Sequence, residues 1–79
     1  MNPIKRKQIE ERAKKLEDEI ATLESTITAR ESSLANFVSA EETARLTQEL
    51  SQSRNELQER TAEWEQIGQE LELGSQENL

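Results

Sequence analysis

The strongest constraint on the fold is an apolar heptad pattern that occurs twice, with a short interruption at residues 36–39. In each half the seam residues, which repeat at alternating steps of four and three, fall on one side of a helix. The first seam comprises Ile9, Ala13, Leu16, Ile20, Leu23, Ile27, Arg30 and Leu34, and the second comprises Leu46, Leu50, Ser53, Leu57, Arg60, Trp64, Ile67 and Leu71. The pattern predicts two long helices that pack along these seams.

Local signals place the ends of the first helix. Asn2 is a favourable N-cap and Pro3 suits the first helical position, where a missing amide hydrogen costs nothing. Asn36 tolerates the left-handed conformation that ends many helices. We therefore predict a helix over residues 3–35 and a loop over residues 36–39.

The second helix has similar signals. Ser39 and Glu42 have the spacing of a capping box, in which the hydroxyl accepts from the Glu42 amide and the carboxylate accepts from the Ser39 amide. This predicts a helix over residues 40–73, with Gly74 ending it. Residues 74–79 resemble a linker followed by a protease-cleavage tag, and we expect them to lie outside the fold.

The short loop forces the two helices to lie antiparallel, because a few residues cannot carry the chain back along a long helix. The fold class is therefore predicted to be all-α, a two-helix antiparallel coiled-coil hairpin. Two registers remain open: Leu16 faces Trp64 in the first and Leu57 in the second. Phe37 and Val38 are expected to fold back over the open end of the seam.

Composition excludes several classes of site. The chain of 79 residues has 32% hydrophobic and 34% charged residues, which fits a narrow apolar stripe better than a globular core. It has no Cys and no His, so thiolate, imidazole and disulfide chemistry cannot be built, and no glycine-rich phosphate loop is present. We expect no catalytic residue, no metal site and no cofactor in this chain, and no apolar run is long enough to span a membrane.

Charge is distributed unevenly. Residues 1–15 carry six basic and two acidic side chains, a net charge of +4, whereas residues 16–79 carry four arginines against fifteen acidic residues, a net charge of −11. Such a dense basic cluster is a candidate for contact with nucleic-acid phosphates. The candidate residues are Lys5, Arg6, Lys7, Arg12, Lys14 and Lys15. The alternative is neutralisation within the hairpin by the acidic end of the second helix, which carries Glu59, Glu63, Glu65, Glu70 and Glu72.

Three unusual seam residues are interpreted as structural. Trp64 is expected to anchor the packing between the helices. Arg30 and Arg60 are expected to lie along the apolar stripe and to reach acidic residues on the other helix.

Three segments resemble the C-terminal coiled-coil domain of the ABC-F subfamily of ATP-binding cassette ATPases: residues 16–24, residues 39–43, and Glu63-Trp64-Glu65. The resemblance covers about residues 3–72. It implies a cytoplasmic accessory hairpin of a protein that acts on ribosomes, with ribosomal RNA, DNA and the parent cassettes as partners. It also implies that the six basic residues form the entry region, and that ATP and Mg²⁺ act only in cassettes outside this chain.

Other functions remain open. The hairpin could be a spacer or a protein-interaction coiled coil without nucleic-acid binding, and it could resemble the tRNA-binding hairpin of a synthetase. Pairing of the two segments between chains would give a dimer, although we expect a monomeric hairpin.

Overall fold

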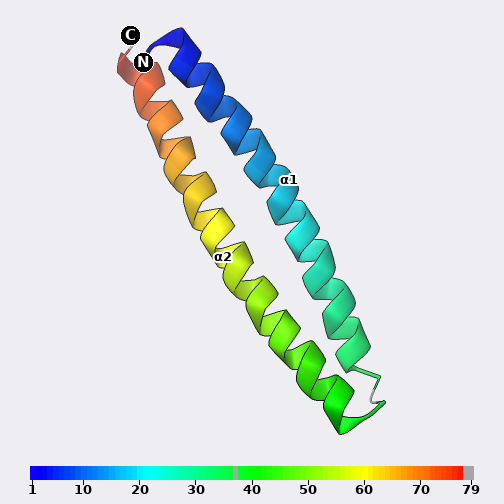
Figure 1. The fold of residues 1–79 in the computed structure, drawn as a ribbon. Helices are drawn as coiled ribbons and strands as arrows, with labels where there is room; N and C mark the ends of the chain where they lie inside the picture. Colours follow the sequence, from blue (N-terminus) through cyan, green and yellow to red (C-terminus); the bar gives the residue numbers. More distant parts are fainter. Residues whose placement is uncertain (37, 78–79) are drawn as a thin grey trace.

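The computed structural model describes residues 1–36 and 38–77, and the side chains of residues 1–36 and 38–73. Helix α1 spans Pro3–Leu34 and helix α2 spans Ala40–Glu77. The helices lie antiparallel, so the start of α1 and the end of α2 lie at the same end of the rod (Figure 1). The molecule measures 59 × 14 × 14 Å. The predicted all-α hairpin is confirmed.

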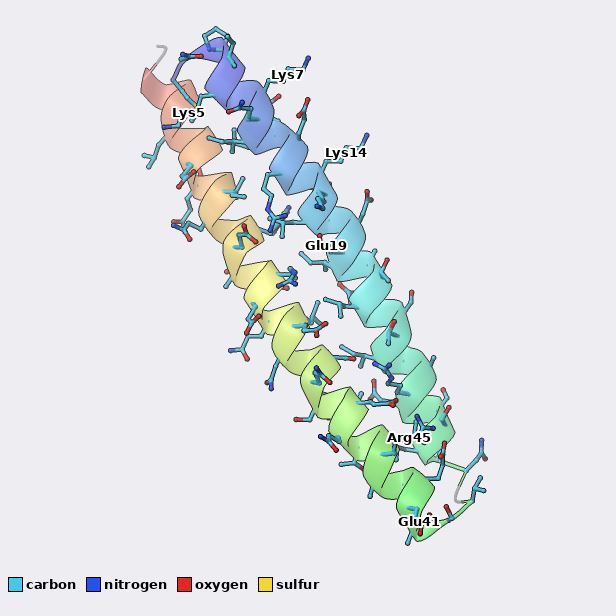
Figure 2. The ribbon with its side chains drawn as sticks, in the orientation of Figure 1. Lys5, Lys7, Lys14, Glu19, Glu41 and Arg45 are labelled. Carbon is cyan, nitrogen blue, oxygen red and sulfur yellow. The ribbon has the colours of Figure 1, made fainter. Side chains whose placement is uncertain are left out.

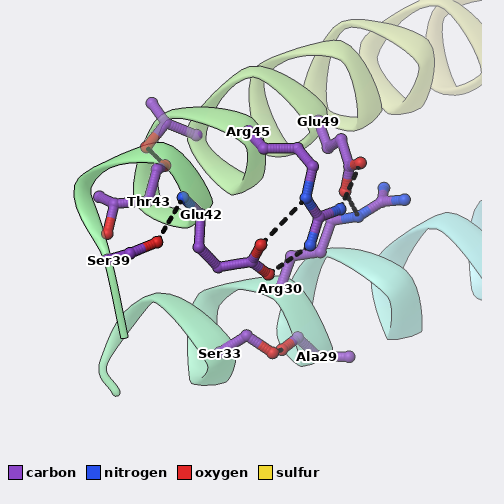
Figure 3. Close-up of polar contacts among 9 residues, drawn as sticks. Ala29, Arg30, Ser33, Ser39, Glu42, Thr43, Arg45 and Glu49 are labelled. Carbon is purple, nitrogen blue, oxygen red and sulfur yellow. Dashed lines mark hydrogen bonds and ion pairs between the residues drawn. The ribbon is translucent and has the colours of Figure 1, made fainter. Parts of the chain in front are cut away.

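Both predicted helix starts are confirmed. The Asn2 side-chain oxygen accepts hydrogen bonds from the backbone amides of Ile4 at 2.8 Å and Lys5 at 3.2 Å, and Pro3 follows it as the first helical residue. The Ser39 hydroxyl accepts from the Glu42 amide at 3.0 Å (Figure 3). Each cap satisfies amide groups that have no partner within the first turn.

The second half of the predicted capping box is wrong. The Glu42 carboxylate does not bond to the Ser39 amide among the described contacts. It accepts instead from Arg45, one turn further along α2, through the guanidinium Nε at 3.2 Å and through Nη2 (Figure 3). A guanidinium within reach offers two charge-assisted hydrogen bonds, which outcompete one backbone amide.

The end of α1 differs slightly from the prediction. The helix ends at Leu34, and Ala35 is its C-cap with φ −67° and ψ −19°. The amide of Ala35 donates to the carbonyls of Glu31 and Ser32 at 3.2 Å each, so the last turn tightens. Asn36 is not left-handed, because no described non-glycine residue has a positive φ.

The predicted end of α2 at residue 73 is wrong, because the helix continues to Glu77. Gly74 therefore lies within the helix, and no described glycine has a positive φ. Glycine costs only about 1 kcal/mol relative to alanine inside a helix, so by itself it does not force an end. The assignment of residues 74–79 to a tag stays a prediction, and residues 78–79 lie outside the described residues.

The seam forms a narrow core. Its buried side chains are Leu16 at 0% exposure, Leu50 and Ser53 at 5%, Ile27 at 8%, and Leu46 and Ile67 at 9%. The other apolar residues of the two seams, apart from Trp64, are half-buried. Two helices cannot cover a seam completely from both sides, and this partial burial is what a two-helix coiled coil allows.

Contacts between the helices select the first of the two predicted registers, in which Leu16 faces Trp64. The Trp64 Nε1 donates to the Glu17 carboxylate at 3.2 Å, so Trp64 lies beside the turn that contains Leu16. The Arg60 Nε lies 2.9 Å from the Glu19 carboxylate. In the second register Trp64 would face Ile9, about two helical turns away from Glu17.

The expectation that Val38 covers the open end of the seam is wrong, because its side chain is 77% exposed. Phe37 lies outside the described residues. No helix among the described residues is both long and apolar enough to cross a bilayer.

Candidate nucleic-acid interface

The six predicted site residues all lie in the first turns of α1, at the end of the rod remote from the loop. We call residues 3–15 of α1 the basic end. No side chain before Leu16 is buried, so the basic end is held against α2 only by half-buried residues such as Ile9 and Ala13. The densest positive charge of the sequence therefore lies in a part of α1 that has no buried side chain of its own.

The lysines of the basic end are available to a ligand. All four side chains are exposed, and none forms an ion pair with another described residue: Lys5, Lys7, Lys14 and Lys15. Lys7 and Lys14 project away from α2, whereas Lys5 lies on the side of α1 that faces α2 (Figure 2). These ammonium groups are free to approach phosphates from outside the hairpin.

The two arginines of the basic end are engaged within the hairpin. Arg12 forms a bidentate pair with Glu63 of α2, with its Nε 3.1 Å and its Nη2 2.7 Å from the two carboxylate oxygens. This hydrogen bonding raises the pKa of Arg12 and lowers the pKa of Glu63. Arg6 pairs with Glu10 on its own helix at 3.0 Å. The structure thus divides the predicted set into four available lysines and two engaged arginines.

Neutralisation by the acidic end of α2 is therefore limited. Of the five acidic residues considered there, Glu63 is the one with a described ion pair to the basic end. Glu59 pairs instead with its neighbour Arg60 on the same helix, at 3.7 Å. Internal neutralisation of the whole basic cluster does not apply to the four lysines, because they form no ion pair with another described residue.

The rest of the hairpin uses its cations differently. We call residues 16–34 of α1 and 40–60 of α2 the shaft, and each of its four arginines is ion-paired with a glutamate. Arg30 pairs with Glu49 at 3.4 Å and donates to the hydroxyl of buried Ser53. Hydrogen bonds with Glu42 and Glu49 raise the pKa of Arg45 (Figure 3). The remaining pairs are Arg54 with Glu31 at 3.5 Å and Arg60 with Glu19 at 2.9 Å. The predictions for Arg30 and Arg60 are confirmed.

Trp64 is not the buried anchor that the heptad pattern predicts, because 40% of its side chain is exposed. On the facing helix, Leu16 is fully buried. The ring lies at the edge of the seam, where its Nε1 bonds to Glu17. It forms one wall of an open groove lined by Glu17, Ile20, Ala21, Glu24, Thr61 and Trp64.

The sequence does contain a signal for this groove, which heptad analysis passes over. Glu17 and Glu24 are seven residues apart and flank Ile20 and Ala21, so a helix places all four residues along one edge of the seam. Among the described residues, no cluster of three or more acidic side chains could hold a metal ion. What these surfaces offer is charge and apolar contact.

We compared the chain with known protein families, with curated proteins and with solved structures, and none of the three comparisons gave a match. Function must therefore be inferred from the fold, the contacts and the charge distribution of the hairpin itself. The observations that bear on function are the exposed lysines of the basic end and the groove beside Trp64.

Proposed function

We propose that this hairpin is a non-catalytic accessory arm of a cytosolic ABC-F ATPase, and that its basic end helps the parent protein to engage ribosomal RNA or another nucleic acid. The observation that carries the proposal is the availability of Lys5, Lys7, Lys14 and Lys15, which are exposed and form no ion pair with another described residue. Support for the family comes from the resemblance of residues 16–24 and 39–43 and of the segment around Trp64. ATP and Mg²⁺ would act in the parent cassettes.

Charge separation gives the interaction a direction. A phosphate backbone is attracted to the exposed lysines of the basic end, and it is repelled by the shaft, where ten acidic residues outnumber four arginines. The hairpin would therefore contact nucleic acid at the basic end and hold its loop away from the polyanion. Most of the affinity would come from released counterions, so binding should weaken steeply as salt rises.

The test is fluorescence anisotropy with short labelled RNA and DNA duplexes over a series of salt concentrations. In the test variant, Lys5, Lys7, Lys14 and Lys15 are changed to Gln. Loss of four phosphate contacts should weaken binding at low salt at least tenfold, and should reduce the slope of log affinity against log salt by about 0.7–0.9 per lost contact.

The matched control lowers the net charge by the same amount at exposed positions outside the basic end. It changes Ser25, Ser32, Ser51 and Gln58 to Glu. Long-range repulsion alone would affect both variants alike, whereas phosphate contact at the basic end affects the lysine variant far more. Equal binding curves for the two variants, or no binding by the wild type at low salt, would exclude the proposed role.

A second candidate function is favoured by a specific observation. The partly exposed Trp64 in an open groove is unusual for a coiled coil that acts only as a spacer, and it suggests contact with a protein. A protein-interaction hairpin would show no response to nucleic acid in the experiment above.

A further inference from the structure

The groove beside Trp64 has an apolar floor between two carboxylates without cationic partners. Ile20 and Ala21 come from α1, and Trp64 comes from α2. Glu17 and Glu24 lie at the two ends of the groove, and neither forms an ion pair with another described residue. Glu17 accepts from the Trp64 indole through one oxygen and keeps further acceptor capacity.

The groove on the other edge of the seam is different. At the same level of the hairpin it is lined by residues of both signs, with Lys15 and Arg60 against Asp18, Glu19 and Glu56. Arg60 already pairs with Glu19 there at 2.9 Å. That groove supplies its own countercharge, whereas the Trp64 groove has carboxylates and no cation among its lining residues. An occupant of the Trp64 groove must therefore bring the positive charge with it.

The spacing in the groove matches the geometry of a helix. Glu17 and Glu24 are seven residues apart, which is about 10 Å along a helix axis. A third helix lying along the groove has the same repeat, so basic residues seven positions apart would meet both carboxylates. The residues midway between them lie on the same face and would meet the apolar floor.

We propose that the groove between Glu17 and Glu24 docks a cationic amphipathic helix of a partner protein, with apolar side chains packed on Trp64 and basic side chains paired with the two carboxylates. This function is separate from the nucleic-acid contact of the basic end. Trp64 suits such a role, because a large ring that is already fixed by a hydrogen bond loses little freedom when a partner covers it.

A second copy of the chain fits this groove poorly. The outer face of its basic end does present Lys7 and Lys14, which are seven residues apart. Between them on that face stands Glu11 rather than an apolar side chain, and it would approach the carboxylates of the groove. The net charge of −7 on each chain also opposes association.

The experiment uses the whole hairpin and a designed probe. The probe is a fluorescein-labelled helical peptide of about 20 residues, with two lysines seven positions apart and two leucines midway between them. Binding is followed by anisotropy of the label and by the emission of Trp64, the only tryptophan in the chain. We expect saturable binding and a shift of the Trp64 emission to shorter wavelength, because leucine side chains displace water from the indole.

Two matched variants locate the binding site. Glu17→Gln with Glu24→Gln removes both groove carboxylates, and Glu11→Gln with Glu70→Gln removes the same charge from exposed positions elsewhere. The groove variant should bind about fivefold more weakly than the matched one, since each exposed pair contributes modestly. Trp64→Leu keeps an apolar seam residue and should weaken binding about tenfold, with helicity checked by circular dichroism.

Several outcomes would overturn the docking proposal. The proposal fails if the peptide does not bind, if the two charge variants lose affinity equally, or if the Trp64 emission is unchanged at saturation. It also fails if sedimentation shows that a second copy already covers the groove. None of these results depends on whether the lysines bind nucleic acid.

Discussion

The shaft and the basic end use cations in opposite ways. In the shaft, each arginine pairs with a glutamate, and the seam beneath includes Ile27, Leu46 and Leu50 as buried residues. In the basic end, the lysines have no described ion pair, and no side chain is buried. The shaft holds the hairpin together, and the basic end carries the charge that can be offered to a ligand.

The choice between arginine and lysine follows this division. A guanidinium presents a rigid fork of donors and forms directed pairs across the seam, whereas an ammonium on a long flexible stem adapts to a diffuse phosphate surface. All four basic residues after Lys15 are arginines. Arg12 marks the border, because it lies in the basic end but bonds across the hairpin to Glu63.

The largest expected effect tests whether the core begins at Leu16. Leu16→Ala removes the one large side chain that is fully buried among the described residues, and it should cost about 2–5 kcal/mol, enough to unfold a marginal hairpin. Ile4→Ala in the basic end, where 72% of the side chain is exposed, should cost less than about 0.5 kcal/mol. Urea unfolding followed by circular dichroism measures both. Similar losses would mean that the basic end and the shaft do not differ in packing.

A smaller change should strengthen the weaker region. Gly68 lies within α2, in the part that faces the basic end, and a Cβ built on it meets no atom within 4 Å. Gly68→Ala should therefore stabilise the hairpin by about 0.5–1 kcal/mol. Urea unfolding gives the free energy, and hydrogen exchange should slow mainly around residue 68. As a control, the reverse change at an exposed position of the same helix, Ala62→Gly, should destabilise the hairpin by a similar amount. If Gly68→Ala destabilised the hairpin, the space around this glycine would not be open.

The coupling energies of ion pairs in the shaft and in the basic end should differ by less than the packing energies do. A double-mutant cycle with Arg60→Ala and Glu19→Ala should give a coupling of about 1 kcal/mol, because this half-buried pair joins the two helices. The pair of Arg6 with Glu10 lies within one helix, and its cycle should give only about 0.3–0.5 kcal/mol. A larger coupling for the pair within α1 would reverse the assigned roles.

The smallest expected effect is the dependence of stability on pH through Glu63. The Arg12 hydrogen bond holds the folded-state pKa of Glu63 below its ordinary value of 4.5, so the ionised carboxylate stabilises the folded state. This contribution is complete above the unfolded-state pKa and is lost as pH falls through the lower folded-state pKa. Titration by NMR should show a higher pKa for Glu63 in Arg12→Gln than in the wild type. The urea midpoint of this variant should also fall less than that of the wild type when the pH is lowered. A Glu63 titration that is the same in wild type and variant would show that the pair is broken in solution.

The sequence is sufficient for the overall fold but not for the register. Heptad spacing, Asn2 and Ser39 predict two helices and their starts, because these signals act within one or two turns. Both registers place apolar residues opposite each other, so hydrophobic pattern alone cannot separate them. Polar contacts between the helices, such as Arg60 with Glu19, decide between them.

Other sequence-based predictions are wrong because a local pattern does not include the other contacts that a side chain can make in the folded hairpin. The Glu42 carboxylate has a guanidinium within reach, and it therefore leaves the amide of Ser39. Trp64 occupies a seam position but is 40% exposed, and its indole bonds to Glu17 at the edge of the seam. The basic cluster is visible in the sequence, although only the structure shows that Arg6 and Arg12 are ion-paired while the four lysines are not.

The slender shape has a mechanical consequence. A rod 59 Å long and 14 Å wide would act as a lever if a ligand held it by its lysines, since both helices resist bending together. A tilt too slight to disturb the gripped turns would still swing the far tip, with its exposed Val38, through a much larger arc.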